Sequence, residues 1–235
     1  MALAAGLLVL VAAFAAPLWQ WLQGPNAGAA GAGAPGDPAG QGLPWQAQVL
    51  PDGLVQVFGL VPGRDDLARA EAILGDGLQV ALVARLGEVG ALEALADPFV
   101  AGFVSGRLVL AFEVPAEALA RWRTGAPHSQ PMADGLRRFA LRPADLPEAR
   151  RSRLVGISLV PALHLSEADL RQRFGAPAEQ RSLGAGAQAL LYPAIGMAAS
   201  VGPASRGVLQ YVAPRDFEAR LRRPLDGMAK PASAP

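Results

Sequence analysis

Two stretches of the chain, one hundred residues apart, have the pattern of a short amphipathic helix that ends at a glycine. The first is GRDDLARAEAILG at residues 63–75, and the second is LHLSEADLRQRFG at residues 163–175. The apolar residues before both stretches also align at this spacing, for example Val55 with Val155. A pattern that recurs at a fixed spacing indicates two copies of one supersecondary unit.

Each expected helix has its own start and stop signals. In the first, Asp65 or Asp66 can accept hydrogen bonds from the free N–H groups of the first turn. In the second, Ser166 and Asp169 have the spacing of a capping box. The glycine that follows each helix can adopt the left-handed conformation that ends it. The sequence therefore predicts both boundaries of both helices.

Short runs rich in aliphatic residues follow each helix, and Gly or Pro clusters bound them. A further helix is expected at 115–124, with Pro115 at its first position and Leu119 and Trp122 facing inward. The expected fold class is α+β, with two tandem repeats of a short helix plus an antiparallel sheet. The expected strands are 78–85, 106–114 and 137–141 in the first repeat, and 189–192, 196–201 and 208–213 in the second.

An N-terminal transmembrane or signal helix is expected before the repeats. Residues 2–22 contain no charged residue, and their length suffices to cross a hydrocarbon core of roughly 30 Å. Trp19 and Trp21 stand at its end, where indoles favour the membrane–water interface. The favoured interpretation is an uncleaved anchor, and the alternatives are a signal peptide cleaved after Ala15 and a buried core helix.

The composition divides the chain into five parts. The Gly, Ala and Pro of residues 24–42 cannot bury enough apolar area to order the segment, which predicts a flexible linker. The expected parts are the anchor or signal peptide at 1–23, the linker at 24–42, the first repeat with insertions at 43–150, the second repeat at 151–227, and a disordered tail at 228–235.

The location follows from the same segment. No Lys or Arg precedes Arg64, so the positive-inside rule gives little information about the orientation of the segment. A short N-terminus ahead of a first apolar helix usually stays in the cytoplasm. We therefore expect a single-pass inner-membrane protein with its C-terminal domain in the periplasm, or a soluble periplasmic protein if the segment is cleaved.

The bulk composition excludes several classes of function. The net charge of +1 argues against a nucleic-acid partner, which requires a basic face. The chain has no cysteine, which excludes disulfides, thiolate metal sites and cysteine nucleophiles.

The second repeat carries the clearest resemblance to a known family. The stretch SLVPALHLSEADLRQRFGAPAEQ at 158–180, with Gly175-Ala176-Pro177 after the helix, resembles the SmpA/OmlA-type (BamE-like) domain. The tandem arrangement is also similar to that of β-lactamase inhibitory proteins. The resemblance implies an exported, non-enzymatic domain that packs against partners. The chain departs from the family by lacking a lipobox cysteine and by carrying insertions at about 87–103 and 115–149.

A search for catalytic residues finds isolated candidates only. The two histidines, His128 and His164, are interpreted as exposed residues without a partner. Ser105 does not have the spacing of a nucleophile elbow, and we interpret its surroundings as a hairpin turn. The GAGAQA motif at 184–189 precedes a strand instead of opening a helix, which disfavours nucleotide binding. The carboxylates are scattered, among them Glu113, Glu117 and Asp134.

Two segments are candidate surfaces. The run EARRSR at 148–153, with Arg142, is interpreted as a solvated connector between the repeats, with contact to anionic headgroups as the alternative. In residues 213–225, Phe217, Leu221 and Leu225 recur every four residues, which predicts a C-terminal helix that closes the core.

The expected function is a membrane-tethered extracytoplasmic protein-binding or scaffolding module of the bacterial envelope. Its partners are the lipid bilayer, through residues 2–22, and an envelope protein of unknown identity. We expect no enzymatic activity, cofactor, metal or catalytic residue, and the partner-binding residues are not identifiable. The alternatives are a periplasmic small-ligand carrier or hydrolase, and an inhibitor-like modulator of an envelope enzyme.

The fate of the N-terminal segment is directly measurable. Mass spectrometry of the protein from fractionated cells is expected to find residues 1–22 intact in the inner-membrane fraction. A soluble chain that starts at Ala16 would contradict the anchor and support a cleaved signal peptide.

Overall fold

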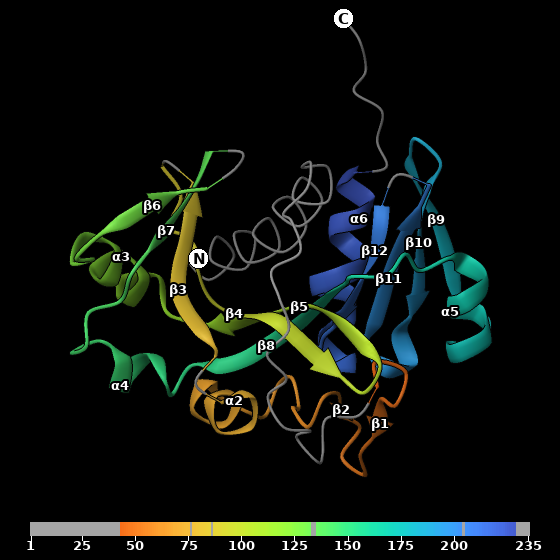
Figure 1. The fold of residues 1–235 in the computed structure, drawn as a ribbon, viewed down its shortest axis with the longest axis horizontal. Coiled ribbons are helices and arrows are strands. Elements are labelled where there is room, and N and C mark those ends of the chain that lie inside the picture. Colours follow the sequence, from red (N-terminus) through yellow and green to blue (C-terminus); the bar gives the residue numbers. More distant parts are fainter. Residues whose placement is uncertain (1–42, 76, 86, 133–134, 204, 229–235) are drawn as a thin grey trace, which may run out of the picture.

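The structure is a computed structural model that describes residues 43–228 except positions 76, 86, 133–134 and 204. Its main feature is one ten-stranded antiparallel sheet, accompanied by a separate pair of short strands (Figure 1). The short pair is β1 (Gln48–Val49) and β2 (Val55–Gln56). In spatial order, the sheet contains β6 (Ser129–Pro131), β7 (Leu136–Phe139), β3 (Gln79–Arg85), β4 (Ala91–Ala101), β5 (Val104–Glu113), β8 (Arg153–Pro161), β12 (Ser205–Tyr211), β11 (Met197–Gly202), β10 (Ala187–Tyr192) and β9 (Glu179–Gly184).

The continuous sheet corrects the expected fold class. The expected α+β arrangement of two repeats, each with its own sheet, is wrong, because the strands of both repeats belong to one sheet. The helices are few and short beside this large sheet. The expected N-terminal helix, the linker at 24–42 and the tail after Met228 lie outside the described residues.

Strand β8 joins the two halves of the sheet. Ile157 lies opposite Leu110 of β5 on one side and opposite Tyr211 of β12 on the other. A strand that is paired on both edges cannot serve as the border of a separate unit. The pairing of β5 with β8 therefore crosses the position at which the sequence suggested a new repeat.

Strand β4 lies in the segment that was expected to be an insertion. It has 11 residues and pairs with both β3 and β5. Its pairing with β5 shifts register between Ala96 and Phe99, at the position of Pro98. A proline without an N–H interrupts the alternation from which strands are recognised, which explains why the sequence pattern missed this strand.

The expected helices and their N-terminal caps are confirmed. The glycines that follow two of them, Gly75 and Gly175, have a positive φ but an extended ψ in place of the expected left-handed helical conformation. In α2 (Leu67–Leu74), the Asp66 side chain accepts a hydrogen bond from Arg69 N. In α5 (Glu167–Phe174), Ser166 and Asp169 form the capping box. Helix α3 (Ala116–Thr124) buries Leu119 and Trp122, although Pro115 precedes the helix instead of occupying its first position. The remaining helical elements are α4 (Leu146–Ala149), η2 (Pro193–Ile195), η3 (Pro214–Asp216), η4 (Glu218–Arg222) and α6 (Arg223–Met228).

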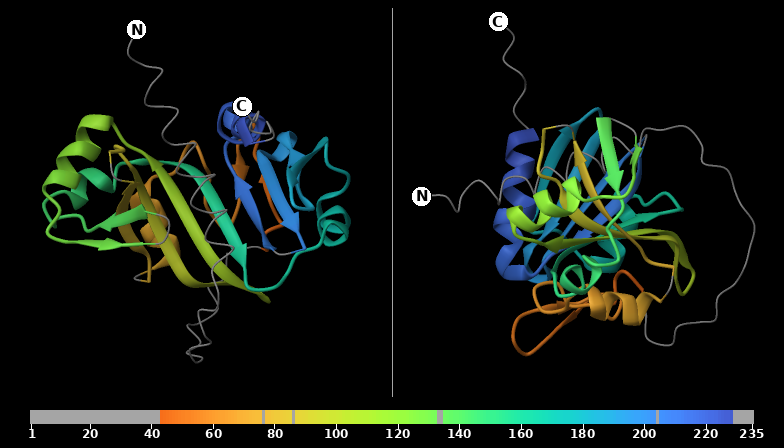
Figure 2. Two further views of the ribbon diagram at one scale, coloured as in Figure 1. Left: turned by 90° about the horizontal axis from the view of Figure 1, so that it is seen from above. Right: turned by 90° about the vertical axis from the view of Figure 1, so that its left-hand side faces the viewer.

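The two faces of the sheet are covered differently. We call the face that carries Leu92, Leu110 and Ile157 the outer face. It packs against α2, α3, α5 and residues 43–61 in the largest hydrophobic cluster. We call the opposite face the inner face. Figure 2 shows that the sheet is strongly twisted, with the β6–β7 and β9–β10 edges at opposite ends of the molecule.

The C-terminal helices cover the β10–β12 half of the inner face. Phe217 and Leu221 are buried against Leu191, Ala198 and Val212, and Leu225 packs beside them. This confirms the predicted C-terminal helix. The helical segment changes type along its length, because η4 is a π-helix and α6 is an α-helix.

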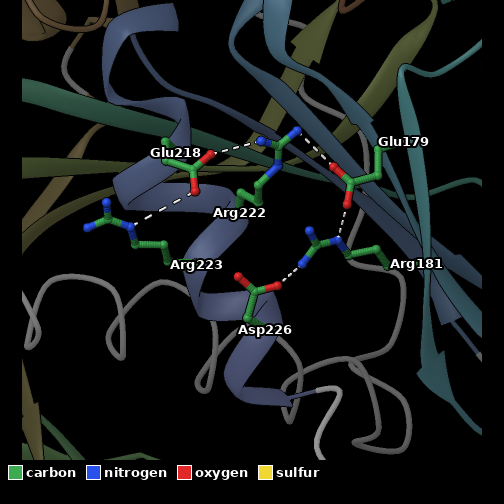
Figure 3. A network of polar contacts seen from close by, with 6 residues as sticks. All are labelled: Glu179, Arg181, Glu218, Arg222, Arg223 and Asp226. Atoms are coloured by element: carbon green, nitrogen blue, oxygen red, sulfur yellow. Dashed lines mark hydrogen bonds and ion pairs between the residues drawn. The ribbon is translucent and has the colours of Figure 1, made fainter.

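A network of ion pairs fastens these helices to edge strand β9 (Figure 3). Arg222 lies 2.9 Å from Glu218 on the same helix and 2.8 Å from Glu179 on β9. Arg181 joins Glu179 to Asp226. Hydrogen bonds, first of all the one from Arg181, lower the pKa of the Glu179 carboxyl. The charged groups of this half of the molecule therefore have a structural role.

The buried helix contact gives a stability prediction. The substitution Phe217→Ala removes a buried aromatic ring and is expected to lower the free energy of unfolding by about 3 kcal/mol. The matched control is Leu163→Ala at a side chain that is 65% exposed, with an expected change below about 0.5 kcal/mol. Urea denaturation followed by circular dichroism measures both, and equal effects would contradict the packing described here.

Candidate functional site

The β3–β8 half of the inner face carries a group of small side chains. We call this surface the small-residue floor and define it as Ala81, Ala91, Ala111, Gly156 and Ser158. The strand register places them on one face, because directly paired residues of antiparallel strands point to the same side. Glu93 lies between Ala81 and Ala111 in this register, and Ala111 lies opposite Gly156.

The alternation of the strands places these small residues on the inner face. In β4, Leu92 and Ala94 point to the outer face and belong to the main core, whereas Ala91 and Glu93 point inward. In β5, Leu110 and Phe112 belong to the core, whereas Ala111 points inward. The inner face of these strands also carries the larger side chains Val83, Leu95 and Val109 around the small ones.

The floor is screened from solvent without belonging to a described core. Ala81, Ala91 and Ala111 are all buried. None of them belongs to the three hydrophobic clusters that the described residues form. An apolar sheet face must be covered by another layer. The C-terminal helices pack on the neighbouring β10–β12 half, and Arg220 of η4 reaches Glu113 on β5 at 3.5 Å.

Ser158 places an unused hydrogen-bonding group on the floor. Its side chain is 0% exposed, and its hydroxyl has no hydrogen-bond partner within the described part of the chain. Leaving a buried hydroxyl unpaired costs about 1–3 kcal/mol, so buried polar groups nearly always have a partner. The hydroxyl is therefore suited to a group that arrives from elsewhere.

Glu93 is the second polar group of the floor. Burial raises the pKa of its carboxyl from the ordinary value of 4.5 to about 7, and the nearby charge of Arg138 opposes this shift. Arg138 lies opposite Val83 in the register and donates a hydrogen bond to the side-chain oxygen of Gln79 at 3.0 Å. Near neutral pH a substantial fraction of Glu93 is protonated and can donate a hydrogen bond.

A second exposed feature lies at the turn between β4 and β5. Phe103 is 67% exposed, and its ring centroid lies 5.6 Å from that of Trp45. The guanidinium of Arg173 lies 3.6 Å from the Trp45 ring centroid. This stack attaches the beginning of the described chain to the β4–β5 turn and to α5. It acts as a structural clamp with an exposed aromatic end.

The isolated candidates from the sequence lie apart from the floor. His128 and His164 are both exposed in connections between elements. Ser105 lies within β5 opposite Val100, so the expected hairpin turn is found slightly earlier, at Gly102 and Phe103. The GAGAQA motif contains the turn between β9 and β10.

The charged candidates take part in ion pairs. Glu113 pairs with Arg153 and Arg220, and Arg142 lies 2.8 Å from Asp145. Glu117 is exposed in the first turn of α3, and Asp134 lies outside the described residues. The basic run at 148–153 connects α4 to β8, as expected of a connector, and its Arg150 lies 2.7 Å from Glu71.

Within the described residues, no group of three or more His, Cys, Asp or Glu side chains could hold a metal ion. None of the described helices has the length and apolar character needed to cross a membrane, and the expected anchor at 2–22 lies outside these residues.

The floor was missed at the sequence level. Its residues come from four strands, and only the register brings Ala81, Ala111 and Ser158 to one surface. The available signal was the segment ALEALA at 91–96, in which small residues and Glu93 alternate with larger ones. Alanine contributes little core volume, so this segment was not interpreted as a buried strand.

Comparisons with known proteins identify no relative. No protein-family model matches this chain, and neither the curated proteins nor the solved structures give a match.

The raised pKa of Glu93 predicts a pH dependence of stability. The unfolded chain loses this proton near pH 4.5 and the folded chain near pH 7, so Glu93 lowers stability as the pH rises between these values. The shift corresponds to about 3 kcal/mol. The variant Glu93→Gln is expected to be more stable than the parent at pH 8, with little difference at pH 4. Urea denaturation across this range measures the effect, and parallel curves for both proteins would contradict it.

Proposed function

We propose that the protein is a membrane-tethered, extracytoplasmic binding module that holds an apolar segment of an envelope protein on the small-residue floor. The observation that carries the proposal is the floor itself, with its buried Ser158 hydroxyl, which has no hydrogen-bond partner among the described residues. The proposed role is binding without catalysis.

The chemistry of the floor favours an apolar helix as the bound element. Small side chains allow a helix backbone to approach a neighbouring surface closely. Ser158 can donate to a carbonyl oxygen of the bound segment, and protonated Glu93 can do the same. A bound segment that is itself rich in small residues would fit best. These requirements describe a helix from a membrane-associated protein better than a charged peptide.

The proposed tether supports the same function. Residues 2–22 would hold the module at the inner membrane, and the linker at 24–42 would let it move over the periplasmic surface. Attachment to the same membrane raises the effective concentration of the module near a membrane-associated partner.

The resemblance to the SmpA/OmlA-type and β-lactamase-inhibitory proteins supports a non-enzymatic role. It rests on α5 with its capping box and on Gly175-Ala176-Pro177. Membership of either family is part of the proposal.

Site-specific photo-crosslinking in intact cells tests the binding surface. A photoreactive residue at Leu95, which lies beside the floor on β4, is expected to crosslink to one envelope protein. The same residue at Leu163 serves as the control, because this exposed loop position is outside the floor. The substitution Ala91→Leu fills part of the floor and is expected to abolish the crosslink from position 95.

Two results would contradict the proposal. Crosslinks of the same partner from positions 95 and 163, or a crosslink from position 95 that persists in the Ala91→Leu variant, would show that the floor is not the binding surface. Circular dichroism of the Ala91→Leu variant checks its fold. If this variant does not fold, Ala81→Val supplies a smaller obstruction on the neighbouring strand.

A further inference from the structure

One end of the central strands exposes apolar side chains. Val100 near the end of β4, Phe103 in the β4–β5 turn and Leu163 after β8 are 47%, 67% and 65% exposed. They share this end, because Val100 lies opposite Ser105 in the register and Ala162 N donates a hydrogen bond to Ser105 O at 2.8 Å. We call Val100, Phe103 and Leu163 the apolar tip. Apolar side chains that gather at an exposed surface mark a contact with a partner or a membrane.

The contacts around the tip hold it in place. The Phe103 ring packs against Trp45, with 5.6 Å between the ring centroids, and Arg173 stands over the Trp45 ring. Gly102 has a φ of 59°, in the left-handed region that favours glycine. A Cβ at this glycine would lie 3.0 Å from the Cδ2 atom of Leu43. The turn therefore presents Phe103 at the surface as a fixed feature of the fold.

The charges around the tip favour an anionic surface. Arg173 and Arg206 are both exposed. Arg206 lies beside the tip, because its carbonyl oxygen accepts a hydrogen bond at 3.0 Å from the backbone two residues after Leu163. Three acidic side chains nearby are engaged within the chain: Asp97 with Arg107, Glu167 with Arg171, and Asp169 with Ser166. Exposed arginines beside apolar side chains are attracted to the headgroups of anionic lipids.

The part of the chain that precedes the described residues joins the domain at this same end. The described chain begins at Leu43, whose side chain lies against Gly102 of the β4–β5 turn. The 42 residues before Leu43 include the apolar segment 2–22, which we propose as the tether. A tether held in a bilayer therefore brings this end of the domain closest to the lipid.

The basic run at 148–153 lies at the other end of β8. The nine residues of β8 separate this run from the tip by about 30 Å at the usual rise of a strand. Two of its arginines are engaged within the chain, since Arg150 lies 2.7 Å from Glu71 and Arg153 pairs with Glu113. The tip combines exposed apolar side chains with exposed arginines, which makes it the better candidate for lipid contact.

We propose that the apolar tip inserts into the headgroup region of an anionic bilayer and fixes the orientation of the domain. Val100, Phe103 and Leu163 enter the boundary between headgroups and acyl chains, and Arg173 and Arg206 contact the lipid phosphates. The inference rests on the proposed function for the tether, which brings the tip to the membrane. It adds an orientation, in which the central strands point away from the bilayer and the floor faces sideways, towards other membrane-associated proteins.

Fluorescence quenching by brominated lipid tests this contact in the full-length chain. The chain has no cysteine, so a single substitution introduces the only thiol for a nitrobenzoxadiazole dye. The test position is Leu163→Cys in the tip, and the matched control is Arg151→Cys, an exposed position at the other end of β8. Each protein is reconstituted into vesicles of phosphatidylcholine and phosphatidylglycerol, with or without bromine near the top of the acyl chains.

The expected result is that brominated lipid lowers the fluorescence at position 163 by about threefold and leaves that at position 151 nearly unchanged. Adding Phe103→Ser to the Leu163→Cys chain is expected to weaken the contact by about tenfold, because a large apolar side chain no longer leaves water. Equal quenching at positions 163 and 151, no quenching at position 163, or quenching that Phe103→Ser leaves unchanged would overturn the inference. Circular dichroism checks the fold, and Val100→Ser replaces Phe103→Ser if that variant does not fold.

Alkaline extraction of the same vesicles separates this inference from the proposed tether. Chains that are quenched at position 163 but removed by extraction would contradict the tether and support the contact of the tip. Chains that resist extraction without quenching at position 163 would support the tether and overturn the contact of the tip. Chains that are removed and never quenched would contradict both.

Discussion

The pairing of β8 on both of its edges is the interaction on which the rest of the structure depends. Ile157 lies between Leu110 and Tyr211, and these three residues belong to the main core of the outer face. The double pairing turns two groups of strands into one sheet. It also places Gly156 and Ser158 in the middle of the inner face, between the half covered by the C-terminal helices and the floor.

The two halves of the inner face differ in how their apolar surface is covered. An apolar sheet face needs a cover, and over β10–β12 the chain provides one permanently with Phe217 and Leu221. Ion pairs between Arg222 and Glu179, among others, hold that cover in place. Over β3–β8 the face includes small side chains, and the polar groups Glu93 and Ser158 stand among them. A polar group within an apolar surface gives up stability unless it is paired, so this half is suited to a partner that pairs with these groups.

The features that the sequence predicted well are local. The capping box of Ser166 and Asp169 was recognisable because all its hydrogen bonds lie within four residues. The helix that buries Leu119 and Trp122 was recognisable from its period. The strands of the second half also overlap their predicted ranges.

The features that were missed depend on distant contacts. The join between β5 and β8 brings together residues more than forty positions apart, for example Leu110 and Ile157, and periodicity within either strand contains no information about the partner. The similar spacing of the two capped helices then favoured two separate sheets. The floor was missed for a related reason. Small inward-facing residues give weak strand patterns, and only the strand register shows that they lie on one surface.

The central claim is that the small-residue floor binds an apolar segment of an envelope protein. Photo-crosslinking in intact cells from position 95, beside the floor on β4, tests it most directly. The proposed function predicts a crosslink to one envelope protein that the Ala91→Leu substitution abolishes. A crosslink that persists in the Ala91→Leu variant would contradict it.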